Sequence, residues 1–541
     1  MAWTHDYLPL GGVWLSSLAA SLPFLILCWQ LLIRKARGHV AALSALAGAF
    51  LLAVLVWKMP LTLALNAGAY GLAFGAFPIL WIILTAMWVY AMTVDAGQFA
   101  IVRDSISALT DDRRIQAIFI AFAFGALLES TAGYGSPVAI GAAMLIGLGF
   151  PPVLAAALCL VANTVPVAYA GLGLPALVAG QVSDLDPFRI SQIIGRQLPV
   201  LAMFVPLWLS VLVCGWRRSW EIWPVLVAGG LGSALPTFLF ANYHGYMLPG
   251  IMGAVGSLAA ITLVMRFWKP ATAFHFAGEA ASGPVLLPEP RVVLRAWMPW
   301  IVLTGLIVLS TFDGVRAVLN GIQYARIPWP GLDGVVLMGE PLSATAAPVP
   351  GRYTLNLLSS PGSIIFFTGL LLPLVMPGYS YGRAFAVLKR TVAQMRFSIL
   401  TVLLILALAQ VMNFSGMSYT LGLAFTYTGP LFLIFAPVLG WVGVFLTGSD
   451  TSSNALFCGM QRTAAQAVGM DPYLAVAANT TGGVTAKMIS PQSIAVAVGA
   501  AGMAGQEGVL LRRTVGHSLL MLGMVCLLTW LQTNVLAWML G

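Results

Sequence analysis

Apolar segments long enough to cross a lipid bilayer recur along the whole chain of 541 residues, and few charged residues interrupt them. Sixty per cent of the residues are hydrophobic and only 8% are charged, whereas soluble chains carry about a quarter charged residues. A soluble globule of this composition would expose large apolar patches and aggregate, and a disordered chain requires low hydrophobicity. The sequence therefore predicts an all-α polytopic membrane protein, because helices satisfy their own backbone hydrogen bonds within lipid.

The remaining composition excludes several classes of partner. The net charge of +9 does not indicate a nucleic-acid partner, because the basic residues are spread through loops without interleaved aromatic residues. The five cysteines lie in apolar segments without metal-ligand spacing, so we expect neither a disulfide framework nor a bound metal. The segment 1–12 lacks the basic residues of a cleaved signal peptide. No cofactor motif stands out, and we expect no cofactor.

Two pairs of short apolar arms interrupt the series of spans. The first pair, 115–150, surrounds the polar sequence ESTAGYGSP, and the second, 431–468, surrounds LTGSDTSSN. An arm of 14 residues rises only about 21 Å as a helix, less than the bilayer core of about 30 Å. We therefore predict two re-entrant hairpins, with tips surrounded by protein or water. Proline and glycine also interrupt two long spans, 152–180 and 473–498, which predicts broken helices.

The distribution of basic residues predicts the topology. If the segment with Arg34 is cytoplasmic, 18 of the 26 Lys and Arg residues fall on the cytoplasmic side and 7 on the external side. Lys487 alone remains inside a span. This bias requires the first hairpin to enter from the cytoplasm and the second from outside, and it places both termini outside.

Opposite entry of the two hairpins predicts an inverted repeat. A phenylalanine precedes a carboxylate by five residues in both hairpins, at Phe124 and Phe445. The broken spans share an Asn-Thr pair, followed by a proline twelve residues after the asparagine. We expect a first repeat half over 1–245, with hairpin 115–150 and broken helix 152–180. Connecting helices and a long external loop follow over 246–357. The second half is 358–541, with hairpin 431–468, broken helix 473–498 and final helix 516–540.

Three charged residues lie at the predicted depth of the bilayer, and each has two interpretations. Glu129 and Asp450 occupy matching positions at the two tips, where an ionised carboxylate is costly. Either acid can therefore carry a coupled proton; the alternative is a permanently ionised tip paired with a cation or helix amides. Lys487 either attracts a substrate carboxylate or forms a standing ion pair with one of the acids.

Broken helices and hairpin tips leave backbone N–H groups free to bind an anion, and polar side chains crowd around them. These are the arrangements of a secondary transporter site. Some of these side chains must only cap helices, and the glycines also suit tight turns. The predicted substrate-binding residues are Ser130, Thr131, Gly133, Gly135, Asn163, Thr164, Ser449, Thr451, Ser452, Ser453, Asn454, Asn479, Thr480, Thr481, Lys487, Ser490 and Gln492.

Long motifs of the chain resemble those of the bacterial L-lactate permeases. They include GLGFPPVLAAALCLVANTVPVA (147–168), GWVGVFLTGSDTSSNALF (440–457) and AANTTGGVTAKMISPQSIA (477–495). In the block GALLESTAGYGSPVAI (125–140), Glu129 keeps the family's acid, but Ser130 and Thr131 replace small residues.

The resemblance implies a transporter, not an enzyme, that imports L-lactate, D-lactate and glycolate with protons across the bacterial inner membrane. The partners it implies are small 2-hydroxy monocarboxylates, protons and the lipid bilayer. A further analogy, to ion transporters with paired hairpins, implies an elevator mechanism and a homodimer.

Two other functions remain open on the residues alone. A sodium-coupled carboxylate carrier can use the same hairpins, with Na⁺ on asparagine and carbonyl oxygens. An intramembrane aspartyl protease requires two adjacent acids, whereas here one of the two is a glutamate and each lies at a separate tip.

Overall fold

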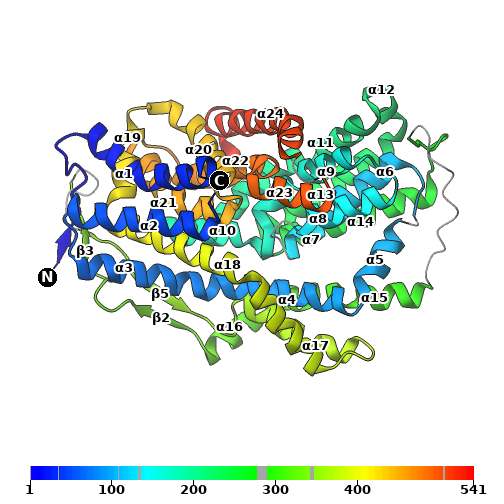
Figure 1. Cartoon of the computed structure of the whole chain (residues 1–541), viewed down its shortest axis with the longest axis horizontal. Helices are drawn as coiled ribbons and strands as arrows, with labels where there is room; N and C mark the ends of the chain where they lie inside the picture. The colour runs from blue at the N-terminus through cyan, green and yellow to red at the C-terminus, as the bar shows by residue number, and fades with distance from the viewer. Residues whose placement is uncertain are drawn as a thin grey trace.

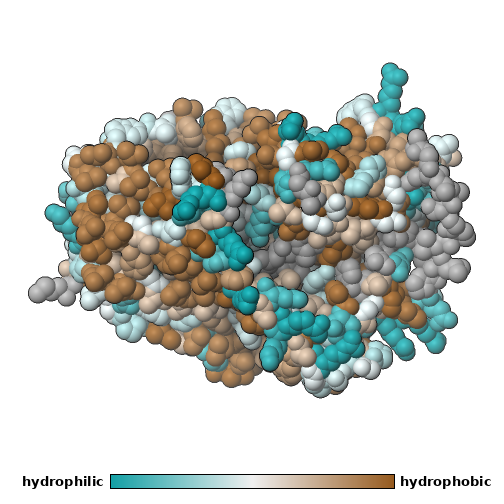
Figure 2. Space-filling view, viewed as in Figure 1, coloured by the Kyte–Doolittle hydropathy of each residue, from teal (hydrophilic) through white to brown (hydrophobic). Residues whose placement is uncertain are grey.

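The computed structural model describes residues 2–34, 36–107, 109–131, 136–276, 289–340, 347–503 and 506–540. Within these ranges, 11 helical segments are long and apolar enough to cross a membrane, and four shorter apolar helices accompany them. Leucines of α1 (Val13–Cys28), α2 (Gly38–Leu55) and α3 (Leu61–Phe74) are exposed, and Figure 2 shows a broad apolar surface over the left of the molecule. Such a surface suits lipid rather than water. The prediction of an all-helical, multi-pass membrane protein is confirmed.

Other helices pack around the two short-armed pairs and the two broken spans. They are η1 (Trp29–Ile33), η2 (Gly75–Leu80), α4 (Trp81–Asp95), α5 (Gln98–Ser107), α11 (Pro187–Cys214), α12 (Trp216–Ser219), η5 (Trp220–Ile222), α13 (Trp223–Tyr243), α14 (Pro249–Phe267), α15 (Pro290–Thr311), α17 (Pro361–Val375), α18 (Tyr381–Phe414), α19 (Met417–Thr426), η6 (Gly429–Leu431), α24 (Glu507–Asn534) and η8 (Ala537–Met539). Figure 1 shows α3 and α4 as one long rod along the lower side of the molecule.

The first short-armed pair forms a completely buried helix followed by a second one. Helices α6 (Arg113–Ala117), η3 (Ile118–Phe124) and α7 (Gly125–Thr131) run continuously, and every residue of this stretch is buried. The next helix that the structure describes is α8 (Ser136–Gly147). The first arm is therefore surrounded by protein, as the prediction of a re-entrant arm requires.

A buried arginine fixes the start of this hairpin. Arg114 donates to both oxygens of Asp112, which caps α6, and to Glu221 at 2.6 Å. It also donates to the backbone oxygens of Arg218 and Thr272. These partners lie before α6, before α13 and after α14, so the arginine joins the hairpin to the connections that flank α13 and α14. A buried charge is tolerated here because acids and carbonyl oxygens accept the hydrogen bonds of the guanidinium group.

The first broken span consists of α9 (Pro152–Ala162), η4 (Val165–Tyr169) and α10 (Ala170–Ser183). Gly171, Leu172 and Gly173 have positive φ, which reverses the local helix sense. A side chain at Gly173 would place its Cβ 2.0 Å from the carbonyl oxygen of Tyr246, so only glycine fits there. The break therefore depends on both the backbone conformation and the close approach of another segment.

The second broken span and the second short-armed pair pack together. The span consists of α22 (Pro472–Ala486), η7 (Lys487–Ile489) and α23 (Pro491–Ala500). The pair consists of α20 (Phe432–Thr447) and α21 (Asp450–Ala467), joined at the left-handed Gly448. A Cβ at Gly440 would lie 1.8 Å from the carbonyl oxygen of Asn479, and one at Gly482 would lie 2.1 Å from that of Pro437. Small residues thus let the backbones of α20 and α22 meet.

The segment 313–356 was predicted as a loop, but it contains α16 (Asp313–Ile322) and four short strands. The strands are β2 (Ala325–Pro328), β3 (Val336–Met338), β4 (Ala347–Pro348) and β5 (Arg352–Leu355). β2 pairs antiparallel with β5, β3 pairs antiparallel with β4, and the N-terminal strand β1 (Trp3–Thr4) pairs parallel with β3. Leu332, Val336 and Val349 are buried, which explains why this weakly hydrophobic segment folds. The sheet places the N-terminal segment on the same side of the protein as this segment (Figure 1).

Candidate functional site

A cavity of about 1130 Å³ lies where the two hairpins and the two broken helices meet. Its mouth is lined by Arg37 and His39 at the start of α2 and by Glu507 at the start of α24. Its floor is lined by the α20–α21 tip, by η7 and the start of α23, by Glu129 at the end of α7, and by the broken segment before Pro175. Arg37 and the start of α24 belong to the side that the basic residues predict to be cytoplasmic.

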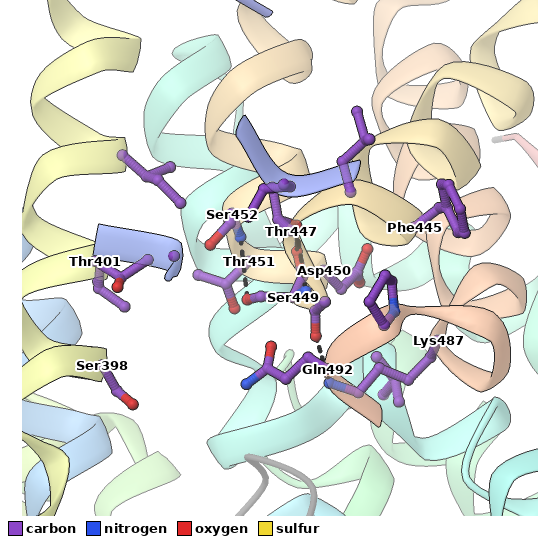
Figure 3. Close-up of a pocket in the computed structure, with 18 of the residues that line it drawn as sticks. Ser398, Thr401, Phe445, Thr447, Ser449, Asp450, Thr451, Ser452, Lys487 and Gln492 are labelled. Atoms are coloured by element: carbon purple, nitrogen blue, oxygen red, sulfur yellow. Dashed lines mark hydrogen bonds between the residues drawn. The ribbon is translucent and has the colours of Figure 1, made fainter. Parts of the chain in front are cut away.

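The three charged residues predicted at membrane depth all line this cavity. Glu129 is 1% exposed, Asp450 is 2% exposed and Lys487 is 6% exposed, so the protein shields all three from water. They come from three separate parts of the chain: α7, the first turn of α21, and η7. Figure 3 shows Lys487 and Gln492 reaching toward Ser449 and Asp450 of the tip.

Lys487 bonds to the hairpin tip rather than to an acid. Its Nζ donates to the carbonyl oxygen of Gly448 at 2.7 Å. In the described part of the chain it makes no ion pair within 4.0 Å, although it attracts both Glu129 and Asp450 electrostatically. An ammonium group has three N–H donors, so Lys487 retains donors that can bind a carboxylate in the cavity.

The two acids differ in their hydrogen bonds. Glu129 Oε2 accepts a hydrogen bond from the side-chain amide of Asn163 at 3.0 Å. Both carboxyl oxygens of Asp450 are buried and have no hydrogen-bond partner among the residues that the structure describes. Asp450 packs against Gly483, where a Cβ would lie 2.5 Å from Oδ1. The site therefore holds one hydrogen-bonded carboxyl group and one that is free of protein donors.

The hydroxyl groups of the second hairpin tip have two roles, because some cap helices and some line the cavity. Ser449 caps α21 by accepting a hydrogen bond from the backbone of Ser452 at 3.3 Å, and Ser490 caps α23 in the same way. Ser449, Thr451 and Ser452 also line the cavity (Figure 3). The N-terminus of α21 therefore points backbone donors and hydroxyl groups toward the space beside Lys487, an arrangement suited to an anion.

A second set of polar residues holds the helices together away from the cavity. Asn454 donates to the carbonyl oxygen of Pro175 at 3.0 Å and accepts from Asn479 at 2.8 Å. Thr480 also donates to Asn454, at 3.2 Å. Thr481 donates to Gln197 of α11 at 2.6 Å. These hydrogen bonds satisfy buried polar groups between neighbouring helices. Interhelical hydrogen bonds of this kind stabilise helix packing in membrane proteins.

The predicted site residues thus fall into two groups, those that line the cavity and those that are buried around it. The residues that line the cavity are Glu129, Ser449, Asp450, Thr451, Ser452, Lys487 and Gln492. The residues that are buried around it are Ser130, Thr131, Asn163, Thr164, Ser453, Asn454, Asn479, Thr480, Thr481 and Ser490. Gly133 and Gly135 lie outside the described residues.

Several polar residues of the site were absent from the sequence prediction. Ser398 and Thr401 of α18 line the cavity wall, and Gln197 and Gln461 bond to residues of α22. Gln197 and Gln461 lie in helices of the protein core, and a scan of apolar segments for uncharged polar residues would have found both. The mouth residue His39 carries no such signal, because it lies at a helix start beside a basic segment.

Many apolar helices that surround a cavity with buried charges define a membrane transport protein. A family model described as L-lactate permease matches residues 16–536. The chain therefore belongs to the L-lactate permease family, and it is a transporter rather than an enzyme. The predicted resemblance is confirmed, and the protease hypothesis is discarded.

Relatives of the chain match it along its whole length. An L-lactate permease of Bacillus subtilis (strain 168) is 42% identical over 563 residues, with 100% of both chains covered. An L-lactate permease of Escherichia coli (strain K12) is 43% identical over 549 residues, with 99% of both chains covered. The glycolate permease GlcA of the same organism is 41% identical over 558 residues, with 100% of both covered.

Among solved structures, the Alcanivorax borkumensis YdaH transporter aligns with 89% of this chain and 88% of its own. The sequence identity is 16% and the TM-score is 0.46, a likeness too low to establish a shared fold.

Proposed function

We propose that this protein imports L-lactate, D-lactate and glycolate together with protons across the inner membrane of a bacterium. The observation that carries the proposal is Lys487, a buried cation at the floor of a cavity that also holds two buried carboxyl groups. The names of its relatives, L-lactate permease and glycolate permease, support small 2-hydroxy monocarboxylates as the substrates.

The substrate carboxylate would bind between Lys487 and the N-terminus of α21. Lys487 supplies charge and N–H donors, while Thr451 and Ser452 supply backbone and hydroxyl donors beside it. Gln492 and Ser449 lie within the same lining and would bond the 2-hydroxyl group. The predicted residues buried around the cavity would act by holding the tips and breaks in place.

Proton coupling follows from the charges of the site. A monocarboxylate adds one negative charge to a cavity that already contains two acids and one lysine. If one acid takes up a proton when the anion binds, the net charge of the loaded site equals that of the empty site. This equality limits the cost of moving the site through a medium of low dielectric constant.

The repeat halves 1–245 and 358–541 would form an inverted pair that moves in elevator fashion as part of a homodimer, with both termini outside the cell. The pairing of β1 with β3 supports a common side for the N-terminus and the segment 313–356. Each broken span lies beside a hairpin tip, and the two tip acids and both breaks line one cavity. This arrangement supports the inverted repeat.

The test is uptake of labelled L-lactate into proteoliposomes with an imposed inward pH gradient, in the presence and absence of sodium. We expect accumulation that requires the pH gradient and ignores sodium. Uptake that follows sodium and ignores the pH gradient would contradict proton coupling.

Such a result would favour the sodium-coupled carboxylate symporter. One observation supports that alternative: Ser130 Oγ, Asn163 Oδ1 and Thr164 Oγ1 are buried oxygens that have no hydrogen-bond partner within the described part of the chain. Oxygen atoms of this kind are ligands for hard cations.

A further inference from the structure

We infer that Asp450 is the group that takes up and releases the transported proton, whereas Glu129 stays ionised and positions the site. This inference rests on the proposed proton coupling and names the residue that performs it. It assigns different roles to two acids that occupy matching positions in the predicted repeat.

Hydrogen bonding distinguishes the two acids. A carboxylate that accepts an N–H hydrogen bond is stabilised in its charged form, and Glu129 accepts such a bond from Asn163. Among the residues that the structure describes, none donates to either oxygen of Asp450, and Asp450 is the only residue there with two buried side-chain oxygens lacking a partner. Asp450 can therefore gain or lose a proton without any change in these hydrogen bonds, whereas the Asn163 amide stabilises the charged form of Glu129.

The charged surroundings of Asp450 are few. Lys487 faces it from η7, Glu129 lines the same cavity, and Cys458 interacts with it from its own helix. The packed helices α10, α20 and α22 contain no Asp, Glu, His, Lys, Arg or Cys. The basic residues of α18 are all exposed, and Tyr419 of α19 packs on Tyr7. Arg37, His39 and Glu507 line the mouth of the same cavity, and Lys487 is the cation at its floor that acts on Asp450.

This arrangement couples the proton to the substrate. Before substrate binds, Lys487 and Asp450 line the same cavity, and a nearby positive charge favours the ionised form of a carboxyl group. A substrate carboxylate at Lys487 would offset that attraction and add a negative charge beside Asp450. Both effects favour protonation of Asp450 when the anion binds, and its deprotonation when the anion leaves. The O–H bond forms on Asp450 with a proton from water, so no other reactant is required.

The assignment of the proton to Asp450 can be tested by measuring how many protons the protein takes up when L-lactate binds. Purified protein in weakly buffered detergent solution is mixed with L-lactate, and a pH indicator reports the protons taken up. We expect about one proton per bound lactate in the wild type. Asp450→Asn should abolish the uptake and make lactate affinity independent of pH, whereas Asp450→Glu should restore it. Glu129→Gln should keep it, and so should the control Glu340→Gln, which changes an exposed acid outside the cavity lining.

Each outcome decides between the hypotheses. Loss of proton uptake in Glu129→Gln, together with its retention in Asp450→Asn, overturns the assignment. If Asp450→Asn does not bind lactate, Glu129→Gln decides alone: retained uptake supports Asp450, and lost uptake refutes it. A wild-type protein that binds lactate without proton uptake would refute the proposed proton coupling itself.

Discussion

We predict that acid weakens the docking of the N-terminal strand, and that one buried histidine determines the size of this effect. His5 is 5% exposed and lies outside the membrane-spanning helices. Its Nε2 donates to the carbonyl oxygen of Phe414 at 3.0 Å, and its Nδ1 lies 3.3 Å from the hydroxyl oxygen of Tyr7. Burial lowers the pKa of His5 from 6.5 to about 4, so acid should release the strand that carries it.

The magnitude follows from the difference between these two pKa values. When the segment undocks, His5 regains an ordinary pKa, so the undocked state binds more protons between about pH 4 and pH 6.5. The stabilisation is fully present above pH 6.5 and is lost as the pH falls toward 4. The difference is worth about 3 kcal/mol, which lowers the docking equilibrium constant about a hundredfold.

Hydrogen–deuterium exchange of the N-terminal segment measures this docking. The amides of Trp3 and His5 donate to Val335 and Leu337 at 2.9 Å, so their protection reports the attachment of β1 to β3. Exchange is compared at each pH with that of a peptide of the same sequence, which corrects for intrinsic exchange rates. We expect protection to fall about a hundredfold between pH 7 and pH 4 in the wild type, and to change little in His5→Gln. The same pH dependence in both proteins would refute the reasoning.

Three further substitutions test the packing and the charges. Gly440→Ala would place a Cβ 1.8 Å from a carbonyl oxygen on α22, and we expect a loss of about 1–3 kcal/mol of stability in thermal unfolding. Gly523→Ala, with no neighbour within 4 Å, is the control and should be nearly neutral. Arg114→Met leaves Asp112 buried without its cation and should cost about 3–5 kcal/mol, part of which Asp112→Asn recovers in the double variant. Lys487→Met should weaken lactate binding at least tenfold in calorimetry, since a charged hydrogen bond contributes about 1.5–3 kcal/mol; an unchanged Kd would exclude Lys487 from the site.

The fold could be predicted wherever a helix is apolar from end to end. The broken span expected at 152–180 is formed by α9, η4 and α10, which end at Ser183. Apolar composition predicts less where a helix continues beyond its apolar part: the apolar stretch 398–413 is only the second half of α18, which begins at Tyr381. The first turns of α18 carry exposed basic residues, which resemble a loop in composition although they are helical.

The charged part of the site could also be predicted, because a charge at membrane depth is costly and therefore rare. The roles of the uncharged residues could not. Thr481 bonds to Gln197, which lies 284 residues away in sequence, and Asn454 bonds to Pro175 across 279 residues. Successive residues on a helix point about 100° apart. The sequence therefore cannot show which of Asn479, Thr480 and Thr481 faces the cavity and which faces a neighbouring helix.

The position of Lys487 links the proposed substrate site to the hairpin. Its hydrogen bond to Gly448 joins the second break to the α20–α21 tip, and Gly448 has the positive φ that ends α20. An ammonium group has three N–H donors, so a substrate carboxylate would bind those that Gly448 leaves free, and a charged acceptor forms a strong bond. One lysine would then hold the substrate, the second break and the tip together at the moment when the charge of the site is balanced.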